Sequence, residues 1–225
     1  MARLKDREKA LALRKEQQMS YSQIKKTLGI SKSTLSYWLR DFPLPEKKIK
    51  ELQRQGWNNS EAARERFRNT MRRKREERLK NTYEKQKKLI LPLNKREIFI
   101  TGLFLYWGEG TKSRRDSLEI ANSDPAVIKF FIYWLTEVLS VPKNKIRIQL
   151  HSYSDMNIDK EMRYWSKELR IPRKQFHRSY VKKTSSERIN HKGSFGHGTC
   201  KIRVYDTQLT EKIFMSIKAV SDRYQ

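Results

Sequence analysis

The chain has 225 residues, of which 51 are lysine or arginine and 25 are aspartate or glutamate, so its formal net charge is +26. Such an excess favours a polyanionic partner, and nucleic acid fits better than a membrane because no apolar run is long enough to span a bilayer. The N-terminus is charged and lacks the apolar core of a signal peptide, and the single cysteine excludes a framework of intrachain disulfides. These features predict a cytoplasmic protein.

Composition and hydrophobic spacing divide the sequence into three segments. Residues 1–44 are predicted to form a helix-turn-helix DNA-binding domain. Residues 45–93 are dense in charge and predict a basic helical linker. Residues 94–225 predict a globular α+β domain.

The first segment contains MSYSQIKKTLGISKSTLSYWLRD, residues 19–41, which has the layout of a helix-turn-helix. Ser20 or Ser22 is a suitable N-cap for a short helix, and Gly29 suits the turn because positive φ costs glycine least. Ser31 is a suitable cap for the second helix. The residues expected to face inward are Ile24, Leu28, Leu35, Trp38 and Leu39.

The stretch GISKSTLSYWLRD, residues 29–41, resembles the helix-turn-helix of resolvase-like and transposase-like proteins, and the resemblance covers most of residues 8–41. The N-terminal turn of the second helix would enter the major groove, where hydroxyl, amine and aromatic groups meet bases and phosphates. The alternative is a helix-turn-helix that only packs protein against protein. The predicted DNA contacts are Lys32, Ser33, Thr34, Ser36, Tyr37 and Arg40.

Residues 60–88 of the second segment contain no glycine or proline and predict one long helix with a thin apolar stripe, capped by Ser60. A helix of this kind is either a solvated connection or a basic rod that lies along the phosphate backbone. Arg72 and Arg73, beside Lys74 and Arg75, are the candidate phosphate contacts.

In the third segment, Asn94 and Glu97 predict a capped helix start, and residues 95–107 are apolar nearly all round, which predicts a buried helix. The elements expected to follow are a strand at 117–123, a helix at 126–139 with Asp124 as cap and Pro125 as first residue, a strand at 145–153, a helix at 158–169, strands at 174–183 and 199–206 around the loop 190–198, and a helix at 209–220. This order predicts helices on one face of a mostly antiparallel sheet.

The other face of this sheet is expected to be polar and basic. Such a face either lies in a DNA groove or is an ordinary solvated surface. The residues predicted to point outward from it, and proposed as DNA contacts, are Arg147, Gln149, His151, Arg178, Lys201 and Arg203.

The apolar helix ends in YWGEGTK, where Glu109 stands between Gly108 and Gly110. The motif and the fold expected for residues 94–220 resemble the LAGLIDADG homing-endonuclease family. The resemblance implies a motif helix at the interface of a homodimer, with both glycines at that interface. It also implies that Glu109 is a catalytic ligand of Mg²⁺, a hard cation that prefers oxygen. Alternatively, Glu109 only balances the charge of the cations that follow it, Lys112, Arg114 and Arg115.

Three hypotheses of function follow from these patterns. The first is a sequence-specific DNA endonuclease of the LAGLIDADG type, dependent on Mg²⁺. The second is a non-enzymatic transcription regulator that keeps the same fold, since fold alone does not fix activity. A transposase or recombinase follows from the helix-turn-helix alone, but no separated acid triad is evident. The potential zinc ligands His191, His197 and Cys200 match no standard zinc spacing.

Overall fold

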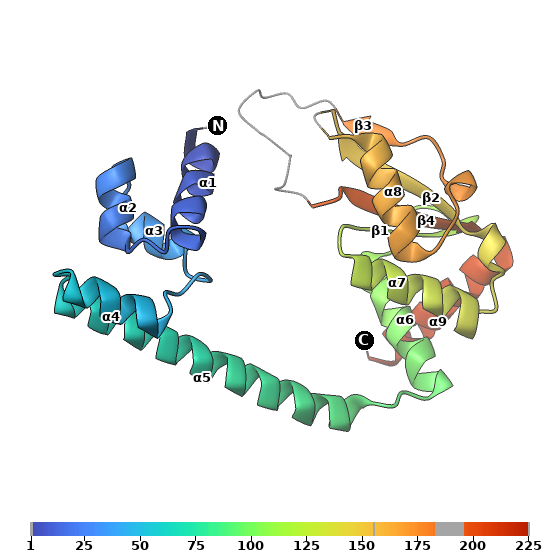
Figure 1. Cartoon of the computed structure of the whole chain (residues 1–225). Coiled ribbons are helices and arrows are strands. Elements are labelled where there is room, and N and C mark those ends of the chain that lie inside the picture. The colour runs from blue at the N-terminus through green and yellow to red at the C-terminus, as the bar shows by residue number, and fades with distance from the viewer. Residues whose placement is uncertain (1, 155, 183–195, 225) are drawn as a thin grey trace. The chain divides into compact units, whose positions relative to one another are not determined.

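The computed structural model describes residues 2–154, 156–182 and 196–224, and it separates into two compact units, Met1–Leu91 and Pro92–Gln225 (Figure 1). His191 and most of the predicted loop 190–198 lie outside the described residues, as does Lys183 at the end of a predicted strand. Each unit is described by itself below.

The first unit begins with the helices α1 (Ala2–Lys15), α2 (Tyr21–Leu28) and α3 (Lys32–Trp38), and these confirm the predicted helix-turn-helix. Ser20 caps α2 in a capping box with Gln23, and Gly29 ends α2 with a φ of 69°. Ser31 caps α3 by accepting a hydrogen bond from the Thr34 amide. The small core consists of Ala10, Tyr21, Ile24, Leu35 and Leu39, all buried.

Two further helices complete this unit: α4 (Glu46–Arg54), which was not predicted, and α5 (Asn59–Ile90). The side chain of Asn58 caps α5, so the helix begins before the predicted cap Ser60. The apolar positions of α4 pack against the start of α5 in a second small core, which comprises Leu44, Ile49, Leu52 and Ala62 with Trp57 at its edge. The basic segment therefore begins as a packed helical hairpin.

A buried ion pair joins α5 to the helix-turn-helix. The side chains of Arg14 in α1 and Glu65 in α5 are almost fully buried, and they form a direct salt bridge. Arg14 also donates hydrogen bonds to the carbonyls of Phe42 (2.7 Å) and Met19 (2.9 Å), and Arg68 donates to Glu65 at 2.9 Å. Buried charges need partners of this kind, so Arg14 and Glu65 fix the position of α5.

The second unit has the predicted order of helices and strands. Its elements are α6 (Lys95–Glu109), β1 (Ser117–Asn122), α7 (Pro125–Tyr133) with a π-helical continuation (Trp134–Val138), a 3₁₀ turn (Lys143–Lys145), β2 (Arg147–Tyr153), α8 (Ile158–Leu169), a second 3₁₀ turn (Arg173–Gln175), β3 (Tyr180–Lys182), β4 (Thr199–Tyr205) and α9 (Thr207–Arg223). Asn94 and Glu97 form the predicted capping box, and Asp124 and Pro125 start α7 as expected. The strand predicted at 174–183 is shorter, because its first residues form the second 3₁₀ turn.

The four strands form one sheet in the order β1-β4-β2-β3 (Figure 1). The pairs β1–β4 and β4–β2 are antiparallel, whereas β2 and β3 are parallel. Helices α6, α7 and α9 pack against β1 on one side of the sheet. The buried residues that the strands direct to this side are Leu118, Ile120, Ile148, Leu150, Cys200, Ile202 and Val204.

The prediction that residues 95–107 form a buried helix holds for only one side of it. One side of α6 packs on the core, where Gly102 is so close to Trp134 that an added Cβ would lie 2.2 Å from the indole ring. The other side is open, with Ile100 39% and Phe104 49% exposed. Hydrophobic composition alone could not distinguish a central helix from one that covers the sheet at the surface.

Candidate nucleic-acid interface

The outer side of α3 is available to a partner. Tyr37 is 68% exposed, Lys32, Ser33 and Arg40 are also exposed, and Ser36 is half-buried. The guanidinium of Arg40 lies over the Tyr37 ring, 5.3 Å from its centre, which places a cation and an aromatic ring together at the end of the helix. These are side chains of the types that read bases and hold phosphates in a major groove.

Two of the predicted contacts on α3 also take part in its N-terminal cap. The hydroxyl of Ser31 lies 2.9 Å from those of Ser33 and Thr34. Hydroxyl groups both donate and accept, so this cluster can cap α3 and still offer hydrogen bonds outward.

Lys32, predicted as a DNA contact at the start of α3, forms an ion pair with Glu61 of α5. Glu61 also accepts hydrogen bonds from Ser22 and from Trp57 Nε1, the latter at 2.9 Å. Partial burial opposes ionisation of Glu61, but the hydrogen bonds from Lys32, Ser22 and Trp57 outweigh it and lower the pKa to about 2. A DNA phosphate at Lys32 would therefore compete with an ionised carboxylate.

The two predicted contacts on α5 have different surroundings. Arg72 is half-buried and donates a hydrogen bond to the backbone carbonyl of Arg40, so it holds α5 beside the end of α3. Arg73 is exposed, as are Lys74 and Arg75 after it. The exposed cations of α5 are thus the ones free to approach a phosphate backbone.

The predicted polar face of the sheet is present in the second unit. Strand pairing sets Glu119, Arg203 and Arg147 side by side in one row, and Ala121, Lys201 and Gln149 in the next. These side chains alternate with the core residues of the same strands, so they lie on the side opposite α6, α7 and α9. In the part of the chain that the structure describes, this face carries more cations than anions.

Glu119 is the feature of this face that sequence reasoning missed. It is only 1% exposed, although it points away from the hydrophobic core. Lys201 Nζ lies 2.8 Å from its carboxylate, and Arg203 Nε forms a second ion pair with the same oxygen. Burial opposes ionisation of Glu119, but these two cations outweigh it and lower the pKa of the carboxyl. Only the cross-strand register brings the three residues together, and one sequence does not reveal it.

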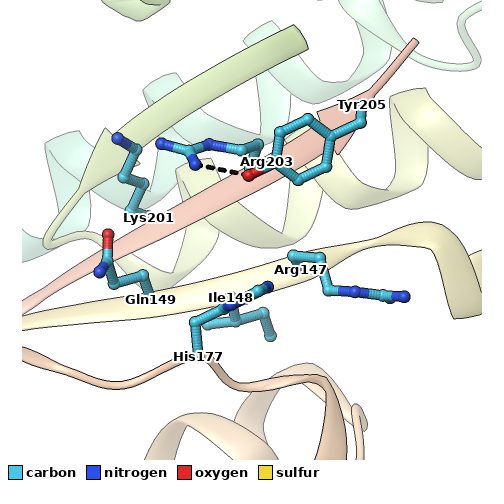
Figure 2. Close-up of a pocket in the computed structure, with 7 residues that line it drawn as sticks. All are labelled: Arg147, Ile148, Gln149, His177, Lys201, Arg203 and Tyr205. Atoms are coloured by element: carbon cyan, nitrogen blue, oxygen red, sulfur yellow. Dashed lines mark hydrogen bonds between the residues drawn. The ribbon is translucent and has the colours of Figure 1, made fainter.

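A small pocket of about 70 Å³ opens on this face between β2 and β4 (Figure 2). Arg203 donates a hydrogen bond of 2.7 Å to the hydroxyl of Tyr205 at its rim. The pocket is lined by Arg147, Ile148, Gln149, His177, Lys201, Arg203 and Tyr205. His177 and Tyr205 were not among the predicted contacts. Tyr205 ends β4 and continues its outward alternation, whereas His177 comes from the irregular stretch before β3.

Two predicted residues of the face, His151 and Arg178, do not line this pocket. Gln149 Nε2 donates a hydrogen bond of 3.1 Å to the backbone carbonyl of Arg178, whose side chain is exposed. His151 meets the edge of the Tyr180 ring at a centroid distance of 5.4 Å. Partial burial and the charge of Lys201 lower the pKa of His151, which favours the neutral imidazole.

Glu109 is the last residue of α6, and it is exposed. Among the described residues no side chain forms an ion pair or hydrogen bond with its carboxylate. Beyond it, Gly110 bridges to Ile120 and the Thr111 amide donates to the carbonyl of Glu119, so the helix ends at the outer edge of β1.

The two glycines beside Glu109 have different environments. Gly108 is exposed, and a Cβ added there would meet nothing within 4 Å. Gly110 is buried, and its added Cβ would lie 2.5 Å from the Tyr106 ring. Within one chain, Gly110 is therefore needed for packing, whereas Gly108 leaves open space on the surface of α6.

Among the described residues, no three His, Cys, Asp or Glu side chains gather into a group that could hold a metal ion. His197 Nδ1 lies 2.6 Å from Oε2 of Glu161. Cys200 is fully buried in the core, and this burial raises the pKa of its thiol. The described helices are also all too short or too polar to cross a bilayer.

Comparison with known families concerns the first unit. Residues 1–42 match the family model of the homeodomain-like domain, which supports the helix-turn-helix formed by α1, α2 and α3. A helix-turn-helix of this kind supports DNA binding. No curated protein and no solved structure matches the chain, so the second unit is interpreted from its geometry.

Proposed function

We propose that this protein binds double-stranded DNA sequence-specifically, with α3 in the major groove and the polar face of the sheet as a second contact surface. The observation that carries the proposal is the homeodomain-like helix-turn-helix, whose α3 leaves Tyr37 and Arg40 exposed beside a cluster of hydroxyl groups. The row of Arg147 and Arg203 on the sheet supports the second surface, since surface cations of this density attract phosphates.

The double variant Thr34→Ala, Tyr37→Ala tests the role of α3. We expect its preference for the target over random DNA to fall by about 1–3 kcal/mol for each base interaction that the substitutions remove, while binding to random DNA changes little. The target is first selected from a random duplex library with the wild-type protein, and both affinities are then measured by fluorescence anisotropy. Tyr133→Phe, on α7 of the other unit, is the control. Equal losses on both duplexes would mean that α3 contacts only the backbone.

A second candidate function is Mg²⁺-dependent cleavage of DNA, as in the LAGLIDADG-type nucleases that the motif around Glu109 resembles. It is supported by the exposed Glu109 carboxylate, which no described side chain neutralises and which lies at the edge of the sheet. A single carboxylate fits Mg²⁺, because this ion usually takes one or two carboxylates together with phosphate and water. When bound, the ion would supply an activated water and stabilise the leaving oxygen. Glu109 would hold it.

Glu109→Gln tests this second candidate. If Glu109 holds the ion, DNA binding survives in the variant, while cleavage with Mg²⁺ is lost because the hard anionic ligand is gone. The measurement is cleavage of a randomised plasmid library by wild type and variant, with EDTA as control. Cleavage that persists in Glu109→Gln would move the active site elsewhere. If wild type cuts nothing with Mg²⁺ or Mn²⁺, the transcription regulator is the better account of the protein.

The nuclease proposal implies a homodimer, because one chain offers a single motif carboxylate. The exposed side of α6 supports pairing: Ile100 and Phe104 are exposed, Phe104 stacks on Trp107 with ring centroids 5.7 Å apart, and Gly108 leaves space beside them. Two such helices can approach each other symmetrically at this stripe. Sedimentation of the protein bound to its target should then give two chains per DNA site.

A further inference from the structure

We infer that the pocket between β2 and β4 binds one phosphate group of the DNA backbone, and that Glu119 and Tyr205 are positioning residues that hold its cations in place. This inference rests on the proposed DNA binding and deepens it, because it assigns the sheet a role in affinity and leaves sequence reading to α3. The pocket and its lining are shown in Figure 2.

The size of the pocket argues for a single small group. Its volume of about 70 Å³ is well below the ~300–1,000 Å³ of typical sites for small organic molecules. A backbone phosphate can enter such a recess while the rest of the duplex stays outside it. The site also lies on an open sheet face that no described helix of this unit covers, so a long polymer can reach it.

The charge of the pocket argues for an anion. Arg147, Lys201 and Arg203 bring three positive charges to its lining, and Glu119 on the neighbouring strand β1 brings one negative charge. Counted together with Glu119, the lining therefore keeps an excess of two positive charges. A base edge is neutral, whereas a phosphate oxygen accepts charge-assisted hydrogen bonds from cations. Arg147 Nη1 donates to the carbonyls of Asn144 (2.5 Å) and Ile146 (3.1 Å), which leaves its other N–H donors for a ligand.

The positions of two of these cations are fixed in advance. Glu119, almost fully buried on the neighbouring strand β1, pairs with Lys201 and with the Nε of Arg203. Tyr205 accepts a hydrogen bond of 2.7 Å from Nη1 of Arg203 at the side. Arg203 has five N–H donors, so those remaining on its terminal nitrogens are left for a ligand. Cations held in this way lose less side-chain entropy when a phosphate binds.

The test uses the full-length protein with the selected target duplex and with a duplex of random sequence. Arg147→Met and Lys201→Met each remove one cation, and Arg203 stays as the partner of Glu119, so the buried carboxylate is not left alone. Near 0.1 M salt we expect each variant to bind both duplexes about fivefold to tenfold more weakly. The slope of log affinity against log salt should fall by about one in magnitude. Arg163→Met, on α8, is the control, since that arginine pairs with Asp159 away from the sheet face.

Tyr205→Phe isolates the positioning role, because it removes one hydroxyl and changes no charge. We expect a loss of affinity of about twofold to tenfold on both duplexes with an unchanged salt slope, and thermal unfolding should match wild type. The control is Tyr133→Phe, at an exposed tyrosine on α7, which should leave both affinities and the salt slope unchanged.

Four results would overturn the inference or part of it. Loss of affinity for the target alone would mean that the pocket reads a base. Unchanged binding by Arg147→Met and Lys201→Met, with wild type still binding DNA, would refute the pocket but leave the proposed function intact. An unchanged affinity in Tyr205→Phe would refute the positioning role. Absence of DNA binding by wild type would instead refute the proposed function, and the phosphate site with it.

Discussion

Raising the salt concentration from about 50 to about 200 mM should weaken binding of the protein to its DNA target by about 10³-fold or more, for roughly six phosphate contacts. Each phosphate that a lysine or arginine neutralises releases condensed counterions, and added salt opposes that release. Candidate cations are present in both units, at Arg40 and Arg73 in the first and at Arg147, Lys201 and Arg203 on the sheet. A net charge of +26 adds long-range attraction in the same direction.

The measurement is a set of binding isotherms over a NaCl series, plotted as log affinity against log salt. The double variant Thr34→Ala, Tyr37→Ala provides an internal control, because a protein that no longer reads bases but keeps its phosphate contacts should keep the slope of wild type. A nearly flat plot for wild type would contradict DNA binding through the phosphate backbone.

The helix-turn-helix was predictable because its determinants are local. Ser20, Gly29 and Ser31 act on the backbone within three or four residues of themselves, through caps and a positive φ, and each does so in the structure. The inward positions Ile24, Leu35 and Leu39 follow from helical spacing alone. The alternation of β2 and β4 was predictable for the same reason, since the period of two needs no knowledge of the partner strand.

The features that sequence reasoning missed depend on contacts between distant residues. Glu119 lies within a predicted strand, but its burial depends on Arg203, which is 84 residues away along the chain. Lys32 was predicted as a DNA contact, and its ion pair with Glu61 depends on the position of α5, which lies far along the chain. Residues 95–107 were predicted to be buried because composition reports hydrophobicity and not position. Phe104 shows the difference, since it is apolar and half exposed.

Arg14 and Glu65 are a further case of the same kind, and they carry the prediction with the largest effect on stability. Fifty-one residues separate them, and each is inconspicuous in a sequence so rich in charge. In the structure both side chains are almost fully buried, and Arg14 reaches the carbonyls of Phe42 and Met19 as well as Glu65. The pair therefore joins α1, two loops and α5 in one network, whose loss should loosen the whole first unit.

Glu65→Gln should destabilise the first unit by about 3–5 kcal/mol, because it keeps the size of the side chain but leaves the charge of Arg14 buried without a counter-ion. Native-state amide hydrogen exchange should show a loss of protection of about 10²-fold or more in α2 and α3, with little change in the second unit. Glu77→Gln is the matched control, since Glu77 is exposed on the same helix and its loss should cost about 0.5 kcal/mol at most. If Glu65→Gln keeps the protection of the control, the pair does not hold the unit together.

The ion pair of Arg14 and Glu65 also predicts how the difference in stability between wild type and Glu65→Gln depends on pH. Burial opposes ionisation of Glu65, but Arg14, Arg68 and the Leu44 amide outweigh it, so its pKa is lowered in the folded protein. A carboxyl with a lowered folded pKa contributes its full stability above its ordinary pKa of about 4.3, and loses it as the pH falls through the folded value. The gap in protection between wild type and Glu65→Gln should therefore be widest near pH 7 and narrow on acidification below about pH 4. A gap that widens in acid would show that the pair does not stabilise the folded state through the ionised carboxylate.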